Sequence, residues 1–204
     1  MQTTLWKVLL GIGRTIDSVN RRIGRAMIFP ILAAVRVSAG NAFSRKLFGL
    51  SCNALLELQW YLAALAFLGA AGYVLLVDEH VRIDALAHRF GPRARAWIDL
   101  VLLVFFVLPL TVLLGDMGFD LAWQAWQSGE MSHNASGLVR WPAYACIPLG
   151  MALLGLQALS ETIRRAAFLR GRVPQAHLSE KMLPPLVAPA GEEAGADAGV
   201  GAGR

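Results

Sequence analysis

Four long runs of apolar residues, separated by short polar segments, dominate the chain. In the clearest run, residues 53–77, the interior from Leu62 to Val77 carries no charge. At a rise of ~1.5 Å per residue, a helix of this length crosses a hydrocarbon core of about 30 Å. The pattern therefore predicts an all-α integral membrane bundle of four transmembrane helices, with spans at about 26–44, 53–77, 96–114 and 141–163.

The segments outside these spans have their own patterns. Residues 1–25 have apolar positions at helical spacing and five basic residues. They fit either a basic amphipathic helix on an anionic cytoplasmic leaflet or a basic extension of the first span. No removable signal peptide is indicated, because an uninterrupted apolar region and a cleavage site are lacking. Residues 79–90 predict a short interfacial helix between the second and third spans, and residues 166–204 predict a largely disordered cytoplasmic tail.

Composition and charge agree with a membrane protein. Of the 204 residues, 56% are hydrophobic and only 16% are charged, whereas charged residues make up about a quarter of soluble domains. The net charge of +5 does not indicate nucleic-acid binding, because the basic residues flank apolar segments. Fourteen Lys and Arg residues lie near one side of the spans and three near the other. The positive-inside rule therefore predicts that both termini are cytoplasmic.

Several polar or small residues within the spans are candidates for contacts. Arg36 lies inside the first span, where an exposed charge is costly, and argues for a partner helix. Small residues of the second span, among them Ala66, Gly69 and Ala70, permit close approach of another helix. Glu57, in the first turn of that span, fits either a proton or ion pathway or a half-solvated helix cap that binds a neighbouring donor, and the cap is favoured. Gln59 and Gln157 are expected to form interhelical hydrogen bonds.

No nucleotide loop, nucleophile elbow or metalloprotease helix is present, so the sequence does not predict an enzyme. No histidine lies inside a span, which disfavours a b-type haem protein. His80, Asp84 and His88 share a helix face, but the two imidazoles are separated by ~12 Å along the axis, too far to share a zinc ion. We therefore expect no metal and no cofactor. Cys52 and Cys146 are expected to be small buried thiols, although a disulfide is conceivable.

An ordered set of motifs gives the chain a resemblance to a known family. The most specific is His80-Val81-Arg82-Ile83-Asp84, directly after the second span. The others, in order, are Asn41, Arg45, Asn53, Glu57-Leu58-Gln59-Trp60-Tyr61, Gly129-Glu130-Met131-Ser132, Trp141-Pro142 and Pro148-Leu149-Gly150. From about Ile16 to Arg165, the chain resembles the small membrane subunit (DctQ-like) of tripartite ATP-independent periplasmic, or TRAP, transporters. Arg36 departs from the pattern, since an uncharged or acidic residue is expected there.

The resemblance implies a small permease subunit of a bacterial inner membrane that catalyses nothing. Its implied partners are membrane lipids, a large membrane subunit with the substrate and sodium sites, and a periplasmic solute-binding protein that typically delivers an organic acid. The expected contacts with the large subunit are Arg36, Asn41, Arg45, Glu57, Gln59, Trp60, Ala66, Gly69, Ala70, His80, Arg82 and Asp84. Those expected to dock the periplasmic protein are Glu130, Ser132, Asn134 and Arg140.

A second hypothesis is a self-sufficient channel or small exporter formed by several copies of the chain. In this alternative Arg36 and Glu57 line a pore, and the chain alone transports solute in liposomes. An accessory subunit instead requires a large partner.

Overall fold

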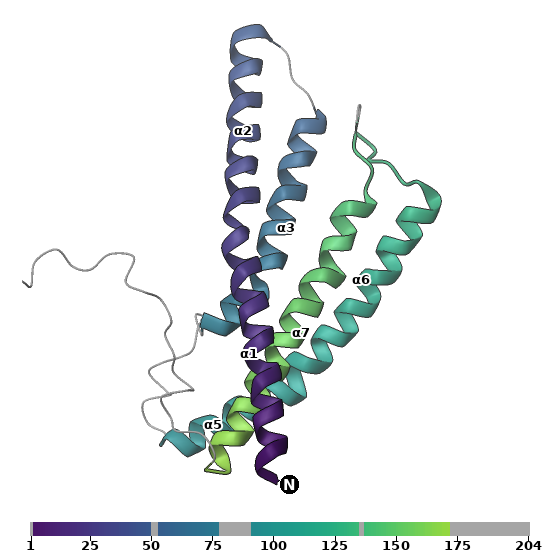
Figure 1. The fold of residues 1–204 in the computed structure, drawn as a ribbon. Coiled ribbons are helices and arrows are strands. Elements are labelled where there is room, and N and C mark those ends of the chain that lie inside the picture. Colours follow the sequence, from purple (N-terminus) through teal and green to yellow (C-terminus); the bar gives the residue numbers. More distant parts are fainter. Residues whose placement is uncertain (1, 50–52, 78–90, 135–136, 172–204) are drawn as a thin grey trace, which may run out of the picture.

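The computed structural model describes residues 2–49, 53–77, 91–134 and 137–171, which are mainly helical (Figure 1). The only β-bridge in these ranges joins Met131 and Val139. The all-α prediction is therefore confirmed. The elements, in chain order, are α1 (Gln2–Ala26), α2 (Ile28–Phe48), α3 (Asn53–Val77), α5 (Pro92–Leu102), a π-helical turn η1 (Leu103–Val107), α6 (Leu108–Ser128) and α7 (Trp141–Leu169).

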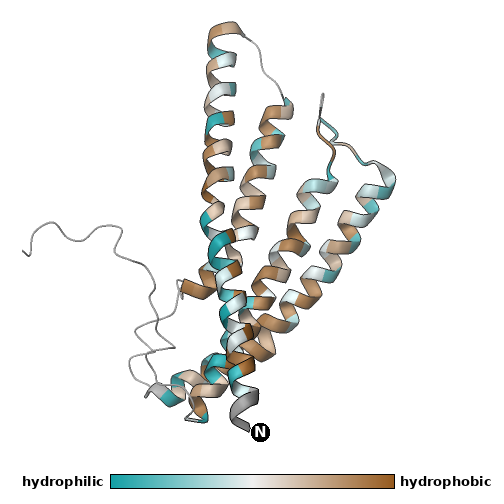
Figure 2. Cartoon of the chain, in the orientation of Figure 1, coloured by the Kyte–Doolittle hydropathy of each residue, from teal (hydrophilic) through white to brown (hydrophobic). Residues whose placement is uncertain are grey.

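Among the described residues, four helical stretches are long and apolar enough to cross a membrane: Trp6–Phe48, Asn53–Val77, Arg93–Ser128 and Trp141–Leu169. Figure 2 shows hydrophobic residues along most of the length of α2, α3, α6 and α7, and many hydrophilic residues on α1. The four predicted spans are thus present as helices. The predicted interfacial helix at residues 79–90 lies outside the described residues, as does most of the predicted tail.

The spanning helices form a row rather than a closed bundle. α2 packs on α3, α3 on α7, and α7 on α6, so that α2 and α6 lie at the two ends of the row (Figure 1). α1 continues almost directly into α2 after Met27 and packs against both α3 and α7. Residues 2–26 therefore form an extension of the first span whose inner face is covered by the protein itself.

Glycines allow the closest approaches in this row. A Cβ atom at Gly150 of α7 would lie 2.7 Å from the Cβ of Leu68 on α3, and one at Gly118 of α6 would lie 2.6 Å from Ile147 Cγ2 on α7. Such distances are too short for carbon atoms, so neighbouring backbones come together only where a side chain is absent.

Pro109 explains the irregular turn before α6. Proline has no N–H to donate to the carbonyl group four residues earlier. Just before it, the backbone widens into the π turn η1, in which the N–H of Leu108 donates to the carbonyl oxygen of Leu103. The third spanning helix therefore continues through the proline, from Arg93 to Ser128.

Candidate functional site

Glu57, near the start of α3, binds the loop between α6 and α7 (residues 129–140). Its Oε1 accepts hydrogen bonds from the Ser132 hydroxyl and from Asn134 Nδ2, the latter at 2.7 Å. Its Oε2 accepts the backbone N–H of Leu138 at 2.7 Å. A single carboxylate therefore joins the start of α3 to a loop about 80 residues later in the chain.

Backbone pairing gives this loop a hairpin-like form. Ser132 N–H donates to the Leu138 carbonyl oxygen at 2.9 Å, and Arg140 N–H donates to that of Glu130 at 3.0 Å. The Arg140 guanidinium also donates to the Glu130 carboxylate at 2.9 Å, with both side chains about a third exposed (33% and 37%). This hydrogen bond raises the pKa of Arg140 above its ordinary value.

The predicted docking residues are thus close together on one loop, but they are not equally available. Ser132 and Asn134 direct their side chains to Glu57, whereas Glu130 and Arg140 form a partly exposed pair and His133 is exposed. Glu57 itself contacts its own chain, as expected of an acid that binds a neighbouring donor.

The residues predicted to contact the large subunit fall into separate groups. Arg36, Arg45 and Trp60 are exposed. Asn41 is buried, and Gly69 lies against Met27. Gln59, Ala66 and Ala70 line an apolar groove of about 1010 Å³ between α2 and α3. His80, Arg82 and Asp84 lie outside the described residues.

The small-residue face of α3 is therefore largely used within the chain. Gly69 is buried against Met27, and Ala66 is buried at the base of the groove beside α2. Arg36 differs, because it is exposed on α2 and forms no ion pair with any described residue. Of the predicted contacts within the spans, Arg36 is the one that most needs a partner.

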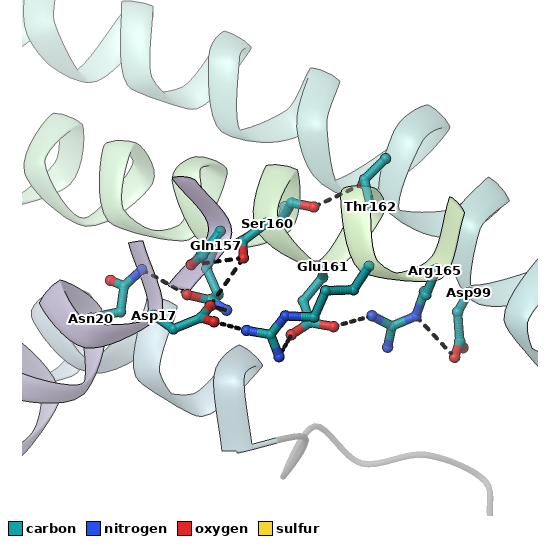
Figure 3. A network of polar contacts seen from close by, with 11 residues as sticks. Asp17, Asn20, Asp99, Gln157, Ser160, Glu161, Thr162 and Arg165 are labelled. Atoms are coloured by element: carbon teal, nitrogen blue, oxygen red, sulfur yellow. Dashed lines mark hydrogen bonds and ion pairs between the residues drawn. The ribbon is translucent and has the colours of Figure 1, made fainter. Parts of the chain in front are cut away.

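A second polar cluster joins α1 to α7 (Figure 3). Gln157, which is fully buried, accepts a hydrogen bond from Asn20 Nδ2 and donates one to Asp17 Oδ1, both at 2.9 Å. The Ser160 hydroxyl lies 3.0 Å from Asp17 Oδ1 and 3.2 Å from the carbonyl oxygen of Gly13. The expected interhelical hydrogen bonds of Gln157 are therefore present, and they hold α1 in a fixed rotation against α7.

Ion pairs extend this cluster to α5. Asp17 of α1 pairs with Arg164 of α7, and the Arg164 guanidinium lies 3.6 Å from the Glu161 carboxylate. Glu161 also pairs with Arg165. Arg165 Nε in turn donates to the Asp99 carboxylate of α5 at 3.3 Å. Acids and bases alternate along the chain of contacts. Because each buried charge has an opposite neighbour, the desolvation cost of the group is offset.

Sequence reasoning did not predict this cluster, apart from the hydrogen bonds of Gln157. A signal was present: Asp17 and Asn20 are polar positions on the same side of α1 as Gly13 and Gly24, at helical spacing. These four positions form one side of α1 that has no basic residue. In the structure all four residues face α3 or α7.

In the described part of the chain, no group of three or more His, Cys, Asp or Glu side chains is arranged to hold a metal ion. Cys146 is a free thiol whose Sγ lies 3.3 Å from the carbonyl oxygen of Pro142. Cys52, His80, Asp84 and His88 lie outside the described residues.

Comparison with known families gives one finding. A sequence model described as "Tripartite ATP-independent periplasmic transporters, DctQ component" matches residues 34–168. These residues include the α6–α7 loop and most of the four spans, whereas α1 precedes them. No curated protein and no solved structure matches the chain.

Proposed function

The chain belongs to the DctQ family of tripartite ATP-independent periplasmic transporter components, and from this premise we propose that it is the small permease subunit of a sodium-coupled uptake system in a bacterial inner membrane. The subunit anchors the large membrane subunit and helps to dock a periplasmic solute-binding protein that carries an organic acid or a related solute. The family match over most of the spanning region is the observation that carries this proposal.

The distribution of basic residues supports the orientation. Lys and Arg concentrate in residues 1–25, 78–95 and 163–181, which the positive-inside rule assigns to the cytoplasm. The α6–α7 loop then faces the periplasm, where a soluble binding protein has access to it. Glu130, Arg140 and the polar loop between them are the proposed docking surface, and Glu57 holds that surface in place.

Arg36 supports a contact with the large subunit. Phe29 and Phe43 lie seven residues on either side of it, on the same face of α2, and are 70% and 67% exposed. This face, with Arg36 at its centre, is the α2 edge of the row. A guanidinium exposed to lipid tails inside a span is costly, so we assign the α2 edge to a helix of the large subunit that presents a polar or acidic side chain.

A pore built from several copies is less well supported. It would use Glu57 as a lining residue, but both carboxylate oxygens of Glu57 already accept hydrogen bonds from the α6–α7 loop.

The proposal is tested by co-expressing the tagged chain with the large membrane subunit of its transporter and purifying the tagged chain in mild detergent. The large subunit is expected to co-purify with the wild type, and its recovery is expected to fall in Arg36→Leu. Arg93→Gln is the control, since Arg93 is exposed near the start of α5, outside the α2 edge.

Two results would contradict the proposal. The first is a chain that purifies alone although the large subunit is present in the membrane. The second is solute transport in liposomes that contain this chain only, which would favour the channel.

A further inference from the structure

The opposite edge of the row carries two acidic side chains. On α6, exposed residues recur at spacings of three and four, namely Pro109, Val112, Asp116, Asp120 and Trp123. This α6 edge is mainly apolar near Asp116, and Val112 is 71% exposed. Leu108, Pro109, Val112, Leu113 and Asp116 form a shallow, open part of this surface.

Packing against α7 gives the depth of Asp116. A Cβ atom at Gly115 would lie 3.6 Å from the Cβ of Met151. Met151 is ten residues from Trp141, where α7 begins, and ten from Glu161, where the buried charges begin. Each interval is about 15 Å of helix, so Met151 lies at the middle of a length that matches the hydrocarbon core.

Asp116 therefore faces outward near the middle of the membrane. The predicted third span ends at about residue 114, which would place Asp116 just outside the bilayer. The contact of Gly115 with Met151 instead places Asp116 beside the centre of α7. A carboxylate exposed to lipid at this depth is costly, and such residues in membrane proteins face protein partners or water-filled cavities.

We propose that the α6 edge packs against a transmembrane helix of the large membrane subunit, and that this helix presents a lysine or arginine side chain to Asp116. The inference rests on the proposed function, because that function supplies a membrane partner. A mainly apolar helix surface with a carboxylate at mid-depth, and a second one, Asp120, one turn nearer the α6–α7 loop, fits a mainly apolar helix with a basic side chain at the depth of Asp116. The opposite charge both satisfies Asp116 and fixes the depth at which the two helices pair.

A second copy of this chain is a poorer occupant. A symmetric contact through two α6 edges would bring two Asp116 carboxylates together. A contact between the α6 edge of one copy and the α2 edge of the next would pair Asp116 with Arg36. The neighbour of Arg36 in the sequence, Val35, lines the same groove as Met151, so the two charges lie at similar depth. That contact is not self-complementary: an open array of copies keeps one unpaired charge at each end, and only a closed ring would pair every Asp116 with an Arg36.

A larger membrane subunit avoids this problem. A larger subunit with a helix at each end of the row would leave neither Arg36 nor Asp116 exposed to lipid. The two charged edges then act as separate contacts with the same partner.

The test uses the complete chain co-expressed with the large subunit, with a photo-crosslinking amino acid at position 112. Illumination of the wild-type complex is expected to join the chain to the large subunit. In parallel, Asp116→Lys is expected to lower recovery of the large subunit roughly tenfold or more, because it places like charges in contact. Asp116→Leu is expected to lower recovery less, and Arg93→Gln, exposed near the start of α5 and outside the α6 edge, is expected to leave it unchanged.

Three outcomes would overturn the inference. One is full recovery of the large subunit with both Asp116→Leu and Asp116→Lys. Another is the absence of an adduct from position 112 in a complex that is otherwise intact; in that case the proposed function stands and only the α6 contact fails. The third is an adduct between two copies of this chain that disappears in Arg36→Leu. Failure of the wild type to bind the large subunit at all would instead contradict the proposed function.

Discussion

Glu57 and Gln157 show how single polar side chains hold together segments that are distant in the sequence. Glu57 joins α3 to the α6–α7 loop, and Gln157 joins α7 to α1. Each side chain contacts at least two partners, so a substitution at either position affects several groups at once.

We expect Glu57→Gln to loosen the α6–α7 loop. The glutamine side chain has only one acceptor oxygen, and its other terminal group, NH₂, is a donor. That NH₂ group would face other donors: the N–H of Leu138 in one orientation, or Ser132 and Asn134 in the other. Hydrogen exchange followed by mass spectrometry should therefore show faster exchange of the Leu138 amide. Glu130→Gln is the control and is expected to change exchange less, because the partly exposed ion pair with Arg140 contributes little. Equal exchange in the Glu57 variant and the wild type would show that the loop does not depend on this carboxylate.

We expect Gln157→Leu to destabilise the fold by about 1–2 kcal/mol, because buried Asp17 and Asn20 each lose a hydrogen bond. The measurement is reversible unfolding of the purified chain in detergent. Gln124→Leu, at an exposed position of α6, should stay within about 0.5 kcal/mol of the wild type. A Gln157 variant as stable as that control would contradict the structural role of the cluster.

At the level of helices, small residues decide which pairs come close. α3 and α7 pack where Gly150 meets Leu68, and α1 meets α3 where a Cβ atom at Gly72 would lie 2.5 Å from Asn20 Oδ1. In lipid no hydrophobic force drives two helices together, so this close packing and the polar contacts hold the row.

Gly150→Ala is therefore expected to cost about 1–3 kcal/mol, since the added methyl group overlaps Leu68 and neither helix backbone can move without shifting its neighbours. Gly40→Ala is the matched control, because nothing lies within 4 Å of the position where its Cβ would be. This variant should be neutral or more stable by up to about 1 kcal/mol, as alanine favours a helix interior. Thermal unfolding in detergent measures both. Equal losses in the two variants would argue against a close α3–α7 contact.

At the level of the whole molecule, Figure 1 shows the start of α1 and the end of α7 at the same end of the helices, opposite the α6–α7 loop, as an even number of membrane spans requires. Which side this is follows from the basic residues and not from the helices. The proposed orientation is therefore open to a direct test.

In a background with Cys52 and Cys146 replaced by serine, we expect His133→Cys to react with a membrane-impermeant maleimide in intact spheroplasts. Ser18→Cys should react only after the membrane is permeabilised, because α1 is proposed to face the cytoplasm. Both positions are exposed in the structure, so accessibility within the fold is matched. The reverse labelling pattern would invert the proposed topology.

The sequence by itself determined the number and the approximate positions of the spans, because the length of an apolar run and the thickness of a bilayer are both fixed quantities. It also identified the family, through motifs such as Glu57-Leu58-Gln59-Trp60-Tyr61, and the family match agrees. The expected role of Glu57 as a local contact followed from its place in the first turn of a helix, but its partners in the α6–α7 loop did not, since they lie about 80 residues away.

Only the tertiary structure decided which sides of the helices meet. Hydrophobic periodicity is weak when lipid and protein are both apolar. The sequence therefore could not show whether Gly69 is covered by another segment or lies on an open helix face. It also could not show that Asp17 pairs with Arg164. The depth of Asp116 likewise depends on the pairing of Gly115 with Met151. Such pairings are set by contacts between distant segments, and a one-dimensional pattern of polar and apolar positions does not contain them.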